Sequence, residues 1–190
     1  MKRWEILQLF IDKLGAKKYL EIGVQWGECF SQISCDYKVG VDPDIGSAAT
    51  HKMTSDQFFA HNQEQFHICF IDGWHGSDQV AKDILNAYKV CPGGIVMVHD
   101  LLPPTEEHQN PYLNGDGWKA WAALKEISKD VMFIIDTDQG CGLIFPRHEP
   151  VGSNLDMSKF DWAWYEANRK NTPVMTVITV DEFKECVNKI

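Results

Sequence analysis

The sequence predicts an α/β domain in which a mostly parallel, doubly wound sheet is covered by helices on both faces. Short, continuously apolar segments such as 66–71 (FHICFI) and 95–98 (IVMV) are typical of strands that are buried on both sides. These segments alternate with stretches of helical periodicity, which is the pattern of parallel strands joined by crossover helices. Two later apolar runs are separated only by residues 137–140, which predicts a C-terminal antiparallel hairpin.

The predicted elements follow this alternation along the whole chain. Helices are predicted over 4–13, 27–33, 57–62 (with Ser55 as N-cap), 77–90, 118–128, 159–169 and 180–189. Strands are predicted over 19–23, 38–42, 66–71, 95–98, 131–136 and 141–145, with a weaker one at 51–54. No linker or repeat divides the chain, so we expect a single domain over 1–190, with a core at about 17–145 and a helical extension at about 146–190.

The composition argues for a folded, acidic protein and against two classes of partner. Hydrophobic residues make up 44% of the 190 residues and aromatic residues 12%, which is enough to form a core. The formal net charge of −9 disfavours nucleic acid, since a phosphate backbone requires a positive face. No apolar run reaches the roughly 20 residues that span a bilayer, and the first residues lack a signal-peptide pattern. We therefore expect a cytoplasmic protein that binds neither nucleic acid nor membrane.

The turn after the first predicted strand favours a nucleoside ligand that has no pyrophosphate. Gly23 and Gly27 allow a ligand to approach the backbone closely. Gln25 and Glu28 stand where a dinucleotide fingerprint requires glycine, and Glu28 would repel a pyrophosphate at a helix N-terminus. Asp42 ends the second strand, where an acid can accept hydrogen bonds from ribose hydroxyls. This combination weakens an NAD-binding interpretation.

Taken in order, five segments resemble a known superfamily. YLEIGVQWG, VGVDPD, MTSDQFF, FIDGWH and PGGIVMVHD resemble the successive motifs of class I S-adenosylmethionine-dependent methyltransferases. Within that superfamily the chain is similar to the small single-domain enzymes of the methyltransferase family 24 type, over roughly residues 17–145. The resemblance implies a Rossmann-like fold, S-adenosylmethionine as cofactor and methyl transfer as the reaction.

The resemblance also assigns cofactor-binding residues by position. Glu21, Gly23 and Gly27 would line the methionine end of the cofactor, and Asp42 would bind the ribose. Ser55 and Asp56, part of a polar cluster that could meet an adenine edge, would border the adenine, and Asp72 would also lie at the cofactor. Gln25 replaces the central glycine of the first motif, so we expect a wider or differently shaped loop there.

Two strands end in ionisable clusters that we interpret as the reacting end of the site. The clusters are Asp72-Gly73-Trp74-His75 and His99-Asp100, and they converge if their strands are neighbours. Methyl transfer to a hydroxyl requires an oriented acceptor and removal of its proton. A histidine suits the proton step because its pKa lies near neutrality. We therefore expect Asp72, His75, His99 and Asp100 to be catalytic, with His75 or His99 as the general base.

A metal site is an alternative for the same residues. Asp72, His99 and Asp100 could hold a divalent cation such as Mg²⁺, which would lower the pKa of an acceptor hydroxyl. The resemblance supports this alternative, because metal-dependent O-methyltransferases use an acid after the fourth strand and an acidic pair after the fifth. His99 departs from the hard-oxygen pattern of Mg²⁺ sites. A third interpretation is that His75 and His99 only cap strand ends.

The acceptor is less well defined by the sequence. The polar, proline-rich segment 101–108 is typical of a loop that covers a substrate. Trp26, Trp74 and Trp118 lie beside proposed ligand loops, where indole rings could stack on a sugar. We expect O-methylation of a small molecule or a sugar hydroxyl. The alternatives are an NAD-dependent oxidoreductase and a cofactor-binding module without catalysis.

Part of the acidic excess falls at the predicted site. Glu21, Asp42, Asp56, Asp72 and Asp100 all lie at or just before the carboxyl edge of the predicted sheet. S-adenosylmethionine carries a sulfonium and an ammonium group and no phosphate. An acidic edge therefore suits S-adenosylmethionine and would repel NAD.

Overall fold

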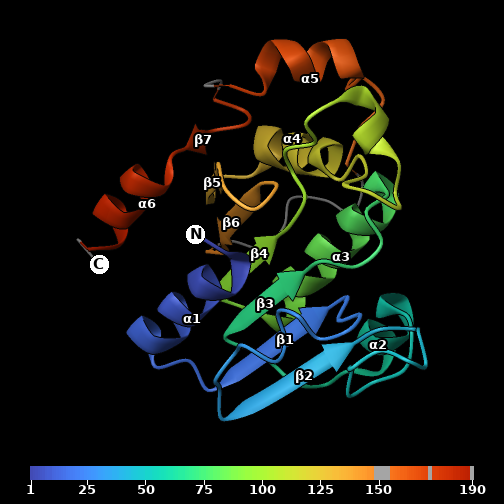
Figure 1. Ribbon diagram of the computed structural model, residues 1–190, viewed down its shortest axis with the longest axis vertical. Coiled ribbons are helices and arrows are strands. Elements are labelled where there is room, and N and C mark those ends of the chain that lie inside the picture. Colours follow the sequence, from blue (N-terminus) through green and yellow to red (C-terminus); the bar gives the residue numbers. More distant parts are fainter. Residues whose placement is uncertain (148–154, 171–172, 189–190) are drawn as a thin grey trace.

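The computed structural model describes residues 1–147, 155–170 and 173–188, and within them a seven-stranded sheet runs through the molecule (Figure 1). The strands are β1 Lys18–Ile22, β2 Tyr37–Val41, β3 Ile68–Ile71, β4 Ile95–Val98, β5 Val131–Ile135, β6 Cys141–Phe145 and β7 Val177–Ile178. The helices are α1 Arg3–Leu14, α2 Ser55–His61, α3 Ser77–Val90, α4 Trp118–Ile127, α5 Trp162–Asn168 and α6 Val180–Val187, with a 3₁₀ turn η1 at Glu106–Gln109. None of the helices in these residues has the length and apolarity to cross a membrane.

The sheet order β2-β1-β3-β4-β6-β5-β7 is that of a Rossmann-like sheet with an antiparallel hairpin. β2, β1, β3 and β4 pair in parallel, whereas β6 runs antiparallel to both β4 and β5. β7, in the C-terminal segment, pairs in parallel with β5. The predicted fold class, a doubly wound and mostly parallel sheet with a C-terminal hairpin, is confirmed.

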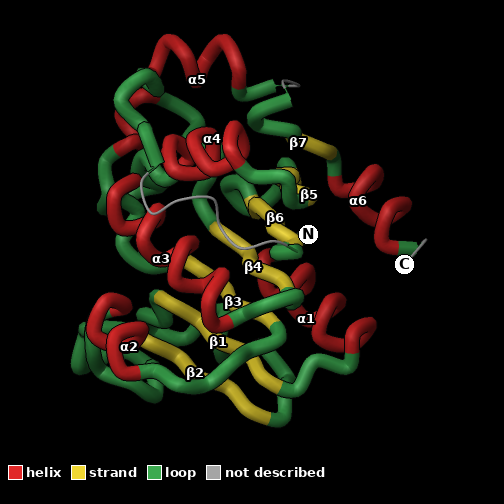
Figure 2. Tube along the Cα trace, turned by 180° about the vertical axis from the view of Figure 1, so that it is seen from behind, coloured by secondary structure: helices red, strands yellow, loops and turns green. Residues whose placement is uncertain are grey.

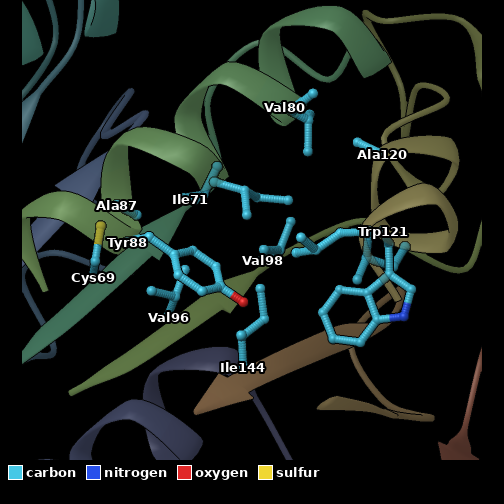
Figure 3. Packing of buried hydrophobic residues seen from close by; sticks show 14 of the residues in the cluster. Cys69, Ile71, Val80, Ala87, Tyr88, Val96, Val98, Ala120, Trp121 and Ile144 are labelled. Atoms are coloured by element: carbon cyan, nitrogen blue, oxygen red, sulfur yellow. The ribbon is translucent and has the colours of Figure 1, made fainter. Parts of the chain in front are cut away.

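Helices cover both faces of the sheet because its strands are apolar on both sides. α1 and α6 pack on one face, as Figure 2 shows from behind, and bury residues such as Phe10 and Phe183 against Phe70 and Met97. α2, α3 and α4 cover the other face. There the alternate strand residues Ile71, Val96 and Val98 meet Val80, Ala87 and Tyr88 of α3 and Trp121 of α4 (Figure 3).

Most element boundaries follow the sequence, but the segment after β1 does not. A helix was predicted over 27–33, and residues 26–32 instead form a succession of turns. Gly27 has a left-handed φ of 82°, and the segment closes a single bond of the α-helical i→i−4 type, from Ser31 N to Gly27 O at 2.9 Å. Lys38 Nζ donates to the carbonyls of Phe30 and Ile33, which satisfies backbone groups that a helix would have paired. The prediction failed because burial of Cys29 and Ile33 gives the same spacing of apolar residues as a helical stripe.

Three smaller expectations also need correction. The weak strand at 51–54 is reduced to one isolated bridge between Val41 and His51. The N-cap of α2 is Thr54, whose hydroxyl accepts from Gln57 N, and Ser55 is the first helical residue. Trp118 is fully buried and stacks on Trp164 at 6.0 Å between ring centroids, so it belongs to the core and not to a ligand loop. The predicted end of the last helix, at residue 189, lies outside the described residues.

Candidate active site

The carboxyl ends of β1, β2, β3 and β4 open into one pocket of about 760 Å³. It lies where β1 sits between β2 and β3, the point at which the sheet order changes direction and ligands of such sheets bind. The predicted site residues that line it are Glu21, Gly23, Asp42, Ser55, Asp56, Asp72, His75, His99 and Asp100. Gly27 does not line the pocket. An added Cβ at Gly27 would lie 2.8 Å from Ala48 Cβ, so this glycine serves packing of the loop.

The turn between β1 and the following loop is held close to β3. Gly23 has φ +84°, and a Cβ added there would lie 2.0 Å from the carbonyl oxygen of Asp72. Gly23 N donates to Val41 O at 2.8 Å, and Asp72 N donates to Ile22 O at 2.8 Å. The ends of three strands therefore meet at Gly23, which only a residue without a side chain permits.

Gln25 keeps a glycine-like backbone at the place where the motif lacks its glycine. Its φ is 48°, in the left-handed region that non-glycine residues seldom occupy. Asp42 holds this conformation, because its Oδ2 accepts from Val24 N at 3.0 Å and from Gln25 N at 2.8 Å. Asp42 Oδ1 accepts from Asp44 N at 2.8 Å, which leaves one lone pair of this oxygen for a ligand hydroxyl. The loop is therefore shaped by Asp42 as well as by the two glycines.

The opposite end of the pocket carries a polar group that the sequence did not single out. Gln79 of α3 shares the two N–H groups of its Nε2 among three oxygens within hydrogen-bond distance, Ser55 Oγ at 3.1 Å, Asp56 Oδ1 at 3.0 Å and Asp83 Oδ1 at 3.1 Å. Its side chain ties the start of α2 to α3. Burial raises the pKa of Asp83 to about 6, although the hydrogen bonds from Ser55 and Gln79 lower it. The predicted adenine edge is thus a hydrogen-bonded network.

Glu21 is a buried carboxyl on the pocket wall. It is 1% exposed and accepts a short hydrogen bond from the Tyr19 hydroxyl. Burial raises the pKa of Glu21 to about 8, against the lowering effect of the Tyr19 hydrogen bond. The group is therefore largely protonated at neutral pH in the ligand-free protein, and a ligand cation placed beside it would favour its ionised form.

Asp72, His75, His99 and Asp100 come together as the sequence predicted. His99 Nδ1 donates to Asp72 Oδ1 at 3.0 Å and lies 3.3 Å from Asp100 Oδ2. The His99 side chain is 4% exposed. Burial would lower the pKa of His99, but Asp72 and Asp100 outweigh it and hold the pKa well above its usual value. Burial raises the pKa of Asp72, but His99 and His75 lower it by more, so the pKa of Asp72 lies below its usual value. His99 is thus a buried imidazolium between two carboxylates.

His75 occupies a different position in the same cluster. Its Nδ1 donates to the carbonyl oxygen of Leu113 at 2.5 Å. His75 lines the pocket, and its Nε2 lies 3.4 Å from Asp100 Oδ2 and 3.6 Å from Asp72 Oδ1. Burial lowers the pKa of His75, but the two carboxylates and the Leu113 carbonyl raise it above its usual value overall. With Nδ1 bound to a carbonyl, the neutral ring has its lone pair on Nε2.

The loop between β4 and α4 holds Asp100 and His75 in place. Asp100 has φ 60°, a strained conformation for a residue other than glycine. Asn114 Nδ2 donates to Asp100 Oδ1 at 2.9 Å and to Gln139 Oε1 at 2.7 Å. A Cβ added at Gly115 would lie 2.1 Å from the carbonyl oxygen of His75, so the loop backbone packs directly on this residue. Asn114 and Gly115 lie in the polar turn before α4, but no local pattern predicts that this turn reaches the cluster.

Two further charged residues complete the cluster, and the sequence did not indicate either of them. Asp138, in the turn between β5 and β6, lies 3.9 Å from His99 Nε2 through its Oδ2. Arg3, at the start of α1, lies 3.5 Å from Asp72 Oδ2 through Nε and 3.2 Å from Asp138 Oδ2 through Nη1. Both come from segments remote in sequence. Only the folded arrangement brings them to the pocket.

The donor atoms of Asp72, His99 and Asp100 satisfy the spacing of a metal site. One ligand atom from each lies within 4.8 Å of the others. The chemistry of the set fits a divalent cation, and an imidazole beside two carboxylates favours Mn²⁺, Fe²⁺ or Zn²⁺ over Mg²⁺. His99 Nδ1 lies 3.0 Å from Asp72 Oδ1 and 3.3 Å from Asp100 Oδ2, so a cation bound by all three residues would have to replace a proton at Nδ1.

A larger hollow of about 1380 Å³ lies at the other edge of the sheet, where β4 and β5 begin. Its lining includes Phe10, Ile95, Val131 and Phe145. It contains none of the carboxylate and histidine clusters described above. The smaller pocket is therefore the candidate active site.

Comparisons with solved structures identify the fold. The O-methyltransferase TomG from Streptomyces achromogenes, in complex with SAM, has a TM-score of 0.61 at 16% identity, over 77% of this chain and 80% of that one. An O-methyltransferase from Bacillus cereus in complex with SAH has a TM-score of 0.58 at 14% identity, over 75% and 80%. This chain has the class I methyltransferase fold.

The SAH-bound methyltransferase PaMTH1 from Podospora anserina is similar as well, with a TM-score of 0.57 at 16% identity over 77% of this chain and 78% of that one. No family model and no curated protein matches the sequence. At these identities the likeness concerns the fold.

Proposed function

We propose that this protein is an S-adenosylmethionine-dependent O-methyltransferase that acts on a hydroxyl of a small molecule or sugar. The observation that carries the proposal is the pocket itself. One cavity is lined both by Asp42, an acid at the position expected to bind a ribose, and by a cluster of two histidines and two acids. The class I fold of solved, cofactor-bound O-methyltransferases supports it. The finer resemblance to methyltransferase family 24 remains part of this proposal.

The charges of the pocket favour this cofactor over NAD. Apart from Glu21, which is largely protonated, its lining holds six carboxyl groups (Glu28, Asp42, Asp56, Asp72, Asp100 and Asp138) against the side chains of Lys2 and Arg3 and the His99 imidazolium. A cofactor with a sulfonium and an ammonium group suits such a surface, whereas a pyrophosphate does not. The helix N-terminus that holds a pyrophosphate after the first strand is also missing, because residues 26–32 form turns.

His75 is the better general base of the two histidines. The Leu113 carbonyl fixes the proton of the neutral ring on Nδ1, which leaves the lone pair on Nε2, beside two carboxylates that line the pocket. An acceptor hydroxyl within hydrogen-bond distance of Nε2 would pass its proton there while its oxygen takes the methyl group, and the methyl–sulfur bond would break to leave S-adenosylhomocysteine. His99 Nδ1 is engaged with Asp72 and Asp100 and holds these two carboxylates in place, whereas its Nε2 has no hydrogen-bond partner in the described residues. Its role in this scheme is to position them and to balance their charge.

The cluster offers a second way to activate the acceptor. Asp72, His99 and Asp100 would hold a divalent cation if it displaced the His99 proton, and a bound cation lowers the pKa of a coordinated hydroxyl. Dialysis against a chelator, followed by readdition of Mg²⁺ or Mn²⁺, separates the two schemes. Activity that survives chelation supports His75 acting without a metal.

A methyl-transfer assay tests the proposed function. Methyl-labelled S-adenosylmethionine is incubated with the protein and panels of sugars, phenols and amines, and label is measured in the products. We expect transfer to a hydroxyl acceptor and a loss of about 10²–10⁴-fold in kcat for His75→Gln. The matched control is His61→Gln, because His61 is an exposed histidine at the end of α2 and lies outside the pocket. Binding of the cofactor without transfer to any acceptor would favour a non-catalytic module.

A further inference from the structure

The first residues of the chain are fastened to the carboxyl edge of the sheet. The backbone N of Arg3 donates to Asp138 Oδ2 at 2.9 Å, and Lys2 Nζ donates to Asp138 Oδ1 at 3.2 Å. Thr137 Oγ1 donates to the carbonyl oxygen of Met1 at 2.6 Å. In both ribbon and tube views the N-terminus lies beside β6 (Figures 1 and 2). These bonds direct the Arg3 side chain into the candidate active site.

The guanidinium of Arg3 bridges three carboxylates from separate segments. Nη1 lies 3.2 Å from Asp138 Oδ2, and Nη2 donates to Glu28 Oε2 at 2.8 Å. Nε lies 3.5 Å from Asp72 Oδ2 and is a buried N–H without a hydrogen-bond partner in the described residues. The Arg3 side chain is 15% exposed, whereas that of Glu28 is 67% exposed. In this fork, Nη2 is therefore bonded to a solvent-exposed carboxylate, and Nε lies near Asp72 without a hydrogen bond.

An incomplete arginine fork is suited to a carboxylate, which accepts two parallel hydrogen bonds from it. Among the described residues that line the pocket, Arg3 and Lys2 are the only Lys or Arg side chains. Arg3 also stands beside Glu28 and Asp72, which follow β1 and β3, where the methionine end of the proposed cofactor is expected. Acidic side chains line most other parts of the pocket wall and would repel a carboxylate there.

We propose that Arg3 binds the α-carboxylate of the cofactor through Nε and Nη2, and that Glu28 occupies part of this position in the ligand-free protein. This inference rests on the proposed function. On binding, Glu28 turns into solvent, which its exposure permits, while Asp138 keeps the guanidinium in place through Nη1. Helix α1 thereby becomes part of the cofactor site.

Calorimetric titration with two ligands tests this inference. The ligands are S-adenosylhomocysteine and its decarboxylated analogue, which lacks only the carboxylate. In the wild-type protein we expect S-adenosylhomocysteine to bind at least 10-fold more tightly than the analogue. Arg3→Gln should weaken S-adenosylhomocysteine about 10- to 100-fold, because a charge-assisted pair is lost, and should change the analogue by less than about 3-fold. Arg3→Lys keeps the charge but lacks the two parallel N–H donors. Its affinity for S-adenosylhomocysteine should therefore lie between those of the wild type and Arg3→Gln.

Glu28→Gln is a variant that does not disturb the buried pairs of Arg3. It removes the competing carboxylate and should tighten S-adenosylhomocysteine by a few fold without changing the analogue. Two results would overturn the role of Arg3 and leave the proposed function standing. One is equal affinity of the two ligands for the wild-type protein, and the other is an equal loss for both ligands in an Arg3→Gln variant whose thermal unfolding is unchanged. If neither ligand binds the wild-type protein, the proposed function itself fails.

Discussion

Replacement of Gly23 by alanine tests whether the ends of β1 and β3 must touch to form the pocket. Gly23 has φ +84°, and the new Cβ would lie 2.0 Å from the Asp72 carbonyl oxygen, 2.4 Å from its carbon and 2.5 Å from Gly73 Cα. All three neighbours are backbone atoms, so they cannot move aside as a side-chain end could. The overlap can be relieved only if the strand ends separate.

The size of the effect follows from two separate costs. A left-handed backbone costs an alanine about 1–2 kcal/mol, and steric overlap in a packed region costs about 1–3 kcal/mol or more. We expect Gly23→Ala to lower the free energy of unfolding by about 2–5 kcal/mol. Gly15→Ala is the matched control, because Gly15 has φ +59° and nothing within 4 Å of the added Cβ. It should lose only about 1–2 kcal/mol.

Urea unfolding and calorimetry on both variants give the answer. For a chain of this length each kcal/mol corresponds to about 2–4 °C in Tm. Gly23→Ala should also weaken S-adenosylhomocysteine, since Asp72 moves with the displaced backbone, whereas Gly15→Ala should bind it as the wild type does. Equal stability and equal binding in the two variants would refute the close contact between Gly23 and Asp72.

Three further predictions concern the charged groups of the site. His99→Gln should lower the free energy of unfolding by about 3–5 kcal/mol in denaturant titrations, since it leaves Asp72 and Asp100 without their buried cation. A loss below about 1 kcal/mol would contradict this. Glu21 has a folded pKa of about 8 against an ordinary value of 4.5, so the folded state holds its proton longer and stability falls as pH rises through this window. As the pH rises between these two values, the free energy of unfolding of Glu21→Gln should therefore increase relative to that of the wild type by about 1.4 kcal/mol per pH unit. Parallel curves of unfolding free energy against pH for the two proteins would contradict this. Asp42→Asn should weaken S-adenosylhomocysteine more than about 10-fold in calorimetry, because it loses a charged acceptor at the loop and at the ribose position; unchanged affinity would remove Asp42 from the site.

The sequence predicted the parts of the fold that depend on local patterns. β4 and α3 begin and end as predicted, because each is a clean apolar run or amphipathic stretch bounded by turn residues. The segment after β1 was misread, since turns that bury Cys29 and Ile33 imitate a helical stripe. Distinguishing the two requires knowledge of the Lys38 side chain, which reaches the turn carbonyls from the next strand.

The same limit applies to the candidate site. Residues at strand ends, such as Asp72 and His99, could be predicted because parallel strands bring their carboxyl ends to one edge. Arg3, Asn114 and Asp138 reach the cluster from a helix start, a loop and a hairpin turn. Nothing in the local sequence of these residues separates them from ordinary surface polar groups. Only the tertiary structure places Arg3 and Asp138 in the pocket and Asn114 behind Asp100.

The measurement that tests the account most directly is a pair of calorimetric titrations of the wild-type protein, one with S-adenosylhomocysteine and one with NAD⁺. The acidic pocket, the Asp42-bound loop and the missing helix after β1 predict binding of S-adenosylhomocysteine in the micromolar range or tighter and no measurable binding of NAD⁺. Binding of NAD⁺ without binding of S-adenosylhomocysteine would contradict the proposed function.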